Sequence, residues 1–286
     1  MRRAATLVEL LVALTLAGLV LGTASRSVLM QQRSSRRLAG AASSDAQSRA
    51  ASDLLRSQLS LVAPKAGDFS GEQSDTALQL RAPVALGAVC ASSAGSAVIS
   101  VDDREEAPTG ATMSPPRAGD SLWWYPDGKA SWVGRRLSNA SAGDDDCPPL
   151  HTVSAPSLRV RLSPADTLPL GAPVRITRQI RYDIYRGSDG RWSLGGRDWS
   201  DATHAFAPPQ PIAGPFVRQA PNGERTGFRF FDADEMELGV GGGSFDVARI
   251  ARIRLTLFSR LTSAPPFGDD VRRDMLEIAL RGHEAR

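Results

Sequence analysis

The sequence predicts an α+β protein in which a long N-terminal helix, part transmembrane and part amphipathic, packs on an antiparallel β-sheet head. Three observations favour this class. Residues 5–25 form an almost uninterrupted apolar run. Residues 26–62 contain no proline and carry apolar side chains at helical spacing. From residue 64 onward, short alternating runs lie between clusters of Pro, Gly, Asp and Ser, which is the pattern of strands and turns.

The composition limits the classes of function. The chain has 286 residues, of which 42% are hydrophobic, so it has enough apolar material for a real core. The formal net charge is +3, and removal of Arg2 and Arg3 with a leader would leave 3 − 2 = +1. A charge so close to zero argues against a nucleic-acid partner.

The apolar run at 5–25 contains one charged residue, Glu9. As a helix its 21 positions extend about 31 Å, which is enough to span a bilayer core. A carboxylate at mid-bilayer costs about 2.5–3.5 kcal/mol on insertion scales, so Glu9 needs a partner. The run is consistent with a secretory signal cleaved near Gly22-Thr23-Ala24, with a simple anchor, or with a short leader before an assembly helix.

The third alternative fits best, because residues 4–10, Ala-Ala-Thr-Leu-Val-Glu-Leu, resemble the type IV prepilin motif. The resemblance implies leader cleavage between Ala4 and Ala5 and N-methylation of Ala5. It assigns Thr6 and Glu9 to filament assembly, with the Glu9 carboxylate paired to the N-terminal amine of a neighbouring subunit. In this sequence Ala4 stands where the family usually has glycine, and Ala5 where it usually has phenylalanine.

The resemblance also implies partners and a location. The partners are the prepilin peptidase, the major pilin, other minor pilins or pseudopilins, an inner-membrane assembly platform, and membrane lipid through residues 5–25. The chain would be a single-pass protein of the inner membrane with its head in the periplasm, and later part of a pilus or pseudopilus tip. Arginines after the span outnumber Arg2 and Arg3 before it, so the motif, and not the charge rule, sets this orientation.

The predicted helix continues beyond residue 25. Ala51, Leu54, Leu55, Leu59 and Val62 recur at spacings of three and four, which gives one apolar face. Pro64 and Gly67 then end the helix. The predicted organisation is a leader at 1–4, a transmembrane half at 5–25, a periplasmic half at 26–63, and a β-rich head at 64–286.

The clearest strand in the head is Val174–Tyr185. Val174, Ile176, Ile180 and other apolar residues alternate with polar ones, and Arg178 is the exception on the apolar face. Residues 122–125 and 132–133 predict an aromatic hairpin. The absence of helix–strand alternation argues against a parallel sheet.

The C-terminal half narrows the resemblance. Residues 180–186, 212–217, 227–232 and 250–258, together with the final 279–282, resemble the strands of J-type pseudopilins and PilW-like minor pilins. This likeness is diffuse along the chain, whereas the motif at residues 4–10 is specific to the wider family.

Cys90 and Cys147 are the only cysteines. Their separation of 57 positions fits neither a zinc site nor a redox pair. In an oxidising compartment they are candidates for one disulfide that closes a long loop, and the alternative is two unpaired buried thiols.

No catalytic constellation and no cofactor motif is present in the sequence. Asp144-Asp-Asp146 and the stretch from Asp232 to Glu237 raise the question of calcium, but consecutive carboxylates on an extended chain point in different directions. We therefore predict no metal site and no enzyme activity.

The predicted function is that of a minor pilin or pseudopilin. Such a structural subunit primes or caps a type IV pilus or a type II secretion pseudopilus. The alternative is a secreted or membrane-anchored β-domain that binds a ligand and carries an ordinary signal peptide.

Overall fold

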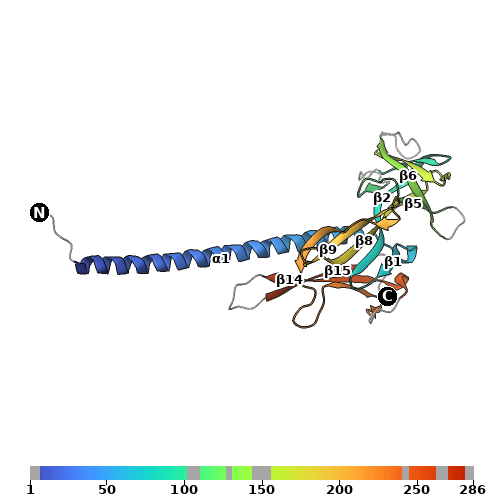
Figure 1. Cartoon of the computed structure of the whole chain (residues 1–286). Helices are drawn as coiled ribbons and strands as arrows, with labels where there is room; N and C mark the ends of the chain where they lie inside the picture. The colour runs from blue at the N-terminus through green and yellow to red at the C-terminus, as the bar shows by residue number, and fades with distance from the viewer. Residues whose placement is uncertain are drawn as a thin grey trace.

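The structure, a computed structural model, describes residues 7–101, 110–126, 131–143, 156–239, 245–261 and 270–280. It consists of one long helix that projects from a β-rich head (Figure 1). The two ends of this helix have different surroundings: its N-terminal end lies far from the head, and its C-terminal end packs against it.

Helix α1 runs from Leu7 to Leu59 and contains 53 residues, which corresponds to a length of about 80 Å. It has no proline along this length. The chain leaves the helix through a short 3-10 helix, η1 (Pro64–Ala66), and Gly67 ends this turn with φ +77°, a left-handed conformation that favours glycine. This turn directs the chain into the first strand of the head.

The larger sheet contains eleven strands, and all of its described pairings are antiparallel. Its strands are β1 (Phe69–Gln73), β2 (Ala77–Ser93), β3 (Ser96–Ser100), β4 (Ala111–Thr112), β5 (Ser121–Trp124), β6 (Val133–Gly143), β7 (Ser157–Ser163), β8 (Pro173–Arg186), β9 (Trp192–Ser200), β10 (Ala205–Phe206) and β11 (Gln210–Phe216).

Six of these strands close into a ring. The order is β2, β3, β7, β6, β5 and β8, and β8 pairs again with β2. One hydrophobic core fills the ring, with Val84, Ile99, Leu122, Val160 and Ile176 among its buried members. The ring forms the part of the head that includes β5 and β6 in Figure 1.

A second, four-stranded sheet has the order β13, β12, β14 and β15 and is also antiparallel. Its strands are β12 (Gly227–Phe231), β13 (Glu237–Leu238), β14 (Arg252–Leu261) and β15 (Asp270–Ala279), with the short 3-10 helix η2 (Val247–Arg249) between β13 and β14.

The main core joins the helix to both sheets. Leu55 and Leu59 of α1 are buried together with Leu80 of β2, Tyr182 of β8 and Ile253 of β14. Strands β2 and β8 contribute to both cores. The first half of β2 and the last half of β8 lie in the main core, and the other half of each strand lies in the core of the ring. These two strands therefore tie the ring to the rest of the head.

The predicted fold class is wrong in its balance of helix and strand. Fifteen described strands in large antiparallel sheets make the chain mostly β, and they accompany one long helix and two short 3-10 helices. A long run of helical residues gives a strong local signal, whereas strand signal is divided among many short runs. The class α+β with a transmembrane-plus-amphipathic stem therefore gave the helix too much weight.

The predicted transmembrane half is also wrong. Within the described part of the chain, no helix combines the length and the apolar character needed to cross a membrane. The predicted span at 5–25 includes polar residues, among them Glu9, Thr15 and Thr23, which lower its mean hydropathy. This finding overturns the predicted single-pass location in the inner membrane. Contact of residues 5–25 with lipid stays a prediction.

Candidate functional site

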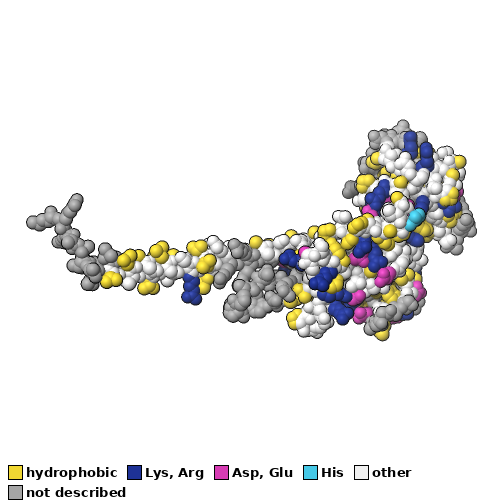
Figure 2. Space-filling view, in the orientation of Figure 1, with side chains coloured by type: hydrophobic (Ala, Val, Ile, Leu, Met, Phe, Trp, Pro, Cys, Tyr) yellow, Lys and Arg dark blue, Asp and Glu magenta, His cyan; other side chains and the backbone are white. Residues whose placement is uncertain are grey.

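Residues 11–38 of α1, which we call the exposed segment, project away from the head. Every side chain that is described in this segment is exposed. The large apolar ones are each more than half exposed: Leu11, Val12, Leu14, Leu16, Leu19, Val20, Leu21, Val28, Leu29, Met30 and Leu38. Figure 2 shows hydrophobic side chains along this part of the helix. So much contiguous apolar surface is typical of an interaction site.

In the first part of the exposed segment, residues 11–21, the apolar surface surrounds the helix. Successive residues of an α-helix are turned by about 100°, so the leucines and valines between positions 11 and 21 point to all sides. The hydroxyl groups of Thr15 and Thr23 donate hydrogen bonds of 2.9 Å to the carbonyl oxygens of Val12 and Val20 within the helix. Even these polar side chains are therefore satisfied locally. A helix that is apolar on every side is typically surrounded by other apolar groups.

The exposed segment contains two glycines at a spacing of four, Gly18 and Gly22. A Cβ atom at either position would meet no atom within 4 Å. Two small residues at this spacing leave a shallow groove on one side of a helix, into which a second helix can pack closely. The sequence interpretation missed this pair, although the spacing itself is the signal that reveals it.

The following part of α1 binds the head and fixes the position of the exposed segment. Ser48 donates a hydrogen bond of 3.0 Å to Asp274 of β15, and the Gln47 side-chain oxygen accepts one of 3.1 Å from the Gly214 backbone. Farther along, the hydroxyl of Tyr182 donates to the side-chain oxygen of Gln58. The head therefore holds the last turns of α1 from several strands.

The residues predicted to act in processing and assembly lie at the start of the chain. Ala4, Ala5 and Thr6 fall outside the described residues. Glu9 lies near the start of α1, and its side chain is not among those described. Cleavage after Ala4, methylation of Ala5 and the assembly roles of Thr6 and Glu9 therefore stay predictions.

The predicted disulfide has one cysteine in the described part of the chain. Cys90 lies in β2 and is 4% exposed. No cysteine of the described residues is free. Cys147 lies outside the described residues, so the pairing of Cys90 with Cys147 stays a prediction.

The acidic stretch after β12 forms a compact turn. The Asp232 carboxylate accepts hydrogen bonds of 3.1 and 2.9 Å from the backbones of Asp234 and Met236, and one of 2.6 Å from Arg249. Desolvation raises the pKa of Asp232, but these hydrogen bonds and the Arg249 charge outweigh it and lower the pKa below its ordinary value. The oxygens of Asp232 are therefore committed to the turn.

No group of three or more His, Cys, Asp or Glu side chains among the described residues could hold a metal ion. The other acidic run, Asp144–Asp146, lies outside them. Comparison with protein-family models, with curated proteins and with solved structures finds no match to this chain. The exposed segment is therefore the feature from which a function can be argued.

Proposed function

We propose that the chain is a non-catalytic structural subunit of the minor pilin or pseudopilin type. In this proposal α1 is the assembly element, and its exposed segment packs among the corresponding helices of other subunits. The partners are the major pilin, other minor pilins or pseudopilins, the assembly platform, and the peptidase that matures the N-terminus. The subunit primes or caps a type IV pilus or a type II secretion pseudopilus.

One observation carries the proposal: the exposed segment is apolar on all sides over residues 11–21 and remains attached to a well-packed head. Full burial of one large apolar side chain contributes about 1.5–3 kcal/mol. Even partial burial of the eleven exposed apolar side chains is therefore worth on the order of 10 kcal/mol. A bundle of helices from several subunits provides cover on every side, as a single flat partner surface does not.

The attachment of α1 to the head supports the same proposal. Ala51, Leu55 and Leu59 are at most 1% exposed, so the end of the helix is part of the main core. A force or a docking constraint on the exposed segment is therefore transmitted directly to the head. The head, which begins near residue 64, is far larger than the helix is thick, and this size favours a subunit present in few copies at a tip.

The glycine pair provides the sharpest test. Gly18→Leu places a large side chain in the groove between Gly18 and Gly22, where it blocks close approach of a second helix. Gly40→Leu is a matched control, because Gly40 lies on the same helix, also has open space around its Cβ position, and is not part of the pair. We expect Gly18→Leu to reduce incorporation into filaments at least tenfold and Gly40→Leu to leave it near the wild-type level.

The readout is the amount of each variant in purified filaments, relative to the amount in whole cells. The melting temperature of the head reports folding, and we expect it to be the same for both variants because neither position touches the head. Equal incorporation of Gly18→Leu and the wild type would contradict the role of the exposed segment.

Sequencing of the mature N-terminus separates the proposal from its alternative. A start at Ala5 with a methylated amine supports a processed assembly subunit. A start at Ser25 would remove residues 11–24, half of the exposed segment, and would identify a secreted binding domain instead. Glu9→Ala tests the pairing role directly: processing should continue, and incorporation should be lost.

A further inference from the structure

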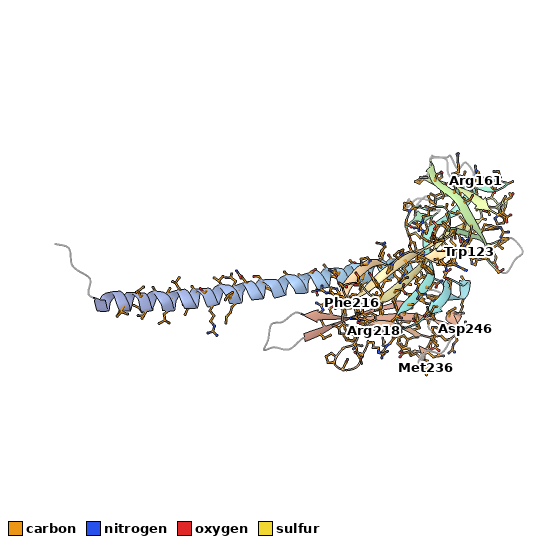
Figure 3. All side chains as sticks on the ribbon, in the orientation of Figure 1. Trp123, Arg161, Phe216, Arg218, Met236 and Asp246 are labelled. Atoms are coloured by element: carbon orange, nitrogen blue, oxygen red, sulfur yellow. The ribbon has the colours of Figure 1, made fainter. Side chains whose placement is uncertain are left out.

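A cleft of about 240 Å³ lies at the boundary between the ring and the rest of the head. Strand β8 pairs with β5 at Val174–Thr177 and with β9 at Ile180–Arg186. At Arg178 and Gln179, between these two stretches, no strand of the described residues pairs with β8 on that side. The cleft opens where the partner of β8 changes from β5 to β9. Figure 3 shows Trp123, one of the lining residues, at the boundary between the ring and the rest of the head.

The charged side chains that line the cleft are mostly arginines. Among the described lining residues there are five arginines and one carboxylate, and the arginines are Arg81, Arg117, Arg135, Arg136 and Arg178. The carboxylate is Asp120, and Trp123 and Trp199 supply flat apolar surface. Because one water molecule occupies about 30 Å³, the cleft has room for a small oxyanion and some water.

The carboxylate in the described lining, Asp120, already accepts hydrogen bonds from protein groups. Asp120 accepts hydrogen bonds of 2.8 and 2.9 Å from the Arg178 guanidinium and one of 2.9 Å from the backbone of Arg117. Its side chain is only 2% exposed and that of Arg178 14%. This buried pair explains why an arginine interrupts the apolar face of β8. It also leaves Asp120 unable to neutralise a second cation.

Two arginines at the rim are held by carboxylates from β9 and the turn after it. Arg117 lies 2.6 Å from Asp198, with both side chains between 40% and 55% exposed. Arg136 pairs with Asp201, and its side chain is 51% exposed. Ion pairs this exposed are weak, because water competes with them. An oxyanion in the cleft can therefore share these guanidinium groups.

Arg81 differs from the other lining arginines. Its guanidinium lies 4.6 Å from the centre of the Trp123 ring and donates one hydrogen bond of 3.0 Å to the Gly67 carbonyl. No carboxylate among the described residues is within salt-bridge distance of it. Asp68, whose charge acts on Arg81, is held by two hydrogen bonds from Arg175. Burial, with the charge of Arg175, lowers the pKa of Arg81 despite the opposing charge of Asp68.

We propose that this cleft binds a small oxyanion, a carboxylate or a phosphate or sulfate group, with Arg81 as its main ligand and with Arg117 and Arg136 at the rim. The planar guanidinium donates in a fork that matches both kinds of oxyanion. Arg81 has no carboxylate within salt-bridge distance among the described residues, contacts the Trp123 ring, and faces a cleft lined by four further arginines. These three features are what an anion-binding arginine needs. The inference is independent of the assembly role of α1.

The test uses the purified full-length chain and inorganic anions as probes. Isothermal titration with phosphate, sulfate and acetate, each against sodium chloride at the same ionic strength, should give saturable binding of at least one oxyanion. We expect a dissociation constant on the order of 1 mM, because one unpaired guanidinium dominates the site. Comparison of phosphate and sulfate with acetate distinguishes a site for a tetrahedral oxyanion from a site for a carboxylate.

Arg81→Gln should weaken binding at least tenfold. Arg161→Gln is the matched control, since Arg161 is an exposed arginine on β7 that does not line the cleft. Arg136→Gln, a change at the rim, should weaken binding by a smaller factor, and it serves as the test if Arg81→Gln does not fold. No saturable binding of any oxyanion, or an equal loss in Arg161→Gln, would overturn the proposal.

Discussion

The two halves of α1 belong to one continuous helix and have opposite surroundings. In the last turns, Ala51, Leu55 and Leu59 are buried against both sheets. In the exposed segment, Leu14 and Leu19 are 62% and 66% exposed. The same residue type therefore has two different roles, depending on its position along the helix.

The difference follows from the arrangement of apolar residues. In the last turns they recur at every third or fourth position, so they form one stripe, and a single sheet surface can cover it. In the exposed segment they surround the helix, and no single surface covers them. The first pattern stabilises the fold of one chain, and the second favours assembly with several others.

Leu55→Ala tests the packed half and should have the largest effect on stability. Leu55 is fully buried, so the truncation leaves a cavity in the main core, and we expect a loss of about 2–5 kcal/mol in the free energy of unfolding. Chemical denaturation measures this loss. Leu54→Ala is the control, because the neighbouring Leu54 is 36% exposed. Equal losses in the two variants would contradict the assigned orientation of the helix.

Tyr182→Phe removes the hydrogen bond between β8 and α1. Tyr182 is 2% exposed, and without its hydroxyl the Gln58 oxygen loses its donor, so we expect a loss of about 0.5–1.5 kcal/mol in the free energy of unfolding. Tyr185→Phe on the same strand is the control. A larger loss in the control than in Tyr182→Phe would show that the hydroxyl contact does not anchor the helix.

The same tyrosine predicts a dependence on alkaline pH. Burial, and to a lesser degree the charge of Asp198, raises the pKa of Tyr182 above its ordinary value of 10.0. The folded chain therefore holds this proton more tightly than the unfolded chain does. This contribution to stability is complete below pH 10 and is lost as the pH rises above it. Denaturation at several pH values should show a steeper alkaline loss in the wild type than in Tyr182→Phe.

Much of the sheet architecture could be predicted from local alternation. The strand expected at Val174–Tyr185 is confirmed as β8, and the predicted antiparallel arrangement is confirmed. The closure of the ring could not be predicted, because pairing of β2 with β8 joins distant segments and has no local signature. The alanines, Pro83 and Gly87 hide the length of β2. Gly87 is required there, since a Cβ atom would lie 2.3 Å from the Ser100 carbonyl oxygen.

The candidate sites differ in how far the sequence reveals them. The apolar character of the exposed segment is visible in the sequence, because it is a property of consecutive residues. The arginines of the cleft come from β2, the loop before β5, β6 and β8, and no spacing connects them. The alternation along Val174–Tyr185 marks Arg178 as an exception on an apolar face, but only the fold identifies its partner, Asp120.

Asp45→Asn tests the point where α1 first meets the head. Asp45 pairs with Arg272 of β15, and the two side chains are 29% and 40% exposed. Because solvent screens the pair, and Arg272 also contacts Asp274, we expect a loss of only about 0.2–1 kcal/mol that decreases at high salt. Denaturation at low and high ionic strength measures it, with the exposed Asp53→Asn as control. A loss that is unaffected by salt would argue against an electrostatic contact.

Leu19→Ala should have the smallest effect on the free energy of unfolding and still impair assembly. Leu19 touches no part of the head, and alanine is the better helix former, so we expect a change below about 0.5 kcal/mol. Incorporation into filaments should decrease, since a leucine that partner helices surround is lost. Ser43→Ala, at an exposed position of α1 outside the exposed segment, should leave incorporation unchanged. The contrast with Leu55→Ala is the decisive comparison, because Leu55 should affect folding and Leu19 should affect assembly. If both variants changed only the free energy of unfolding, the exposed segment would have no role in binding partners.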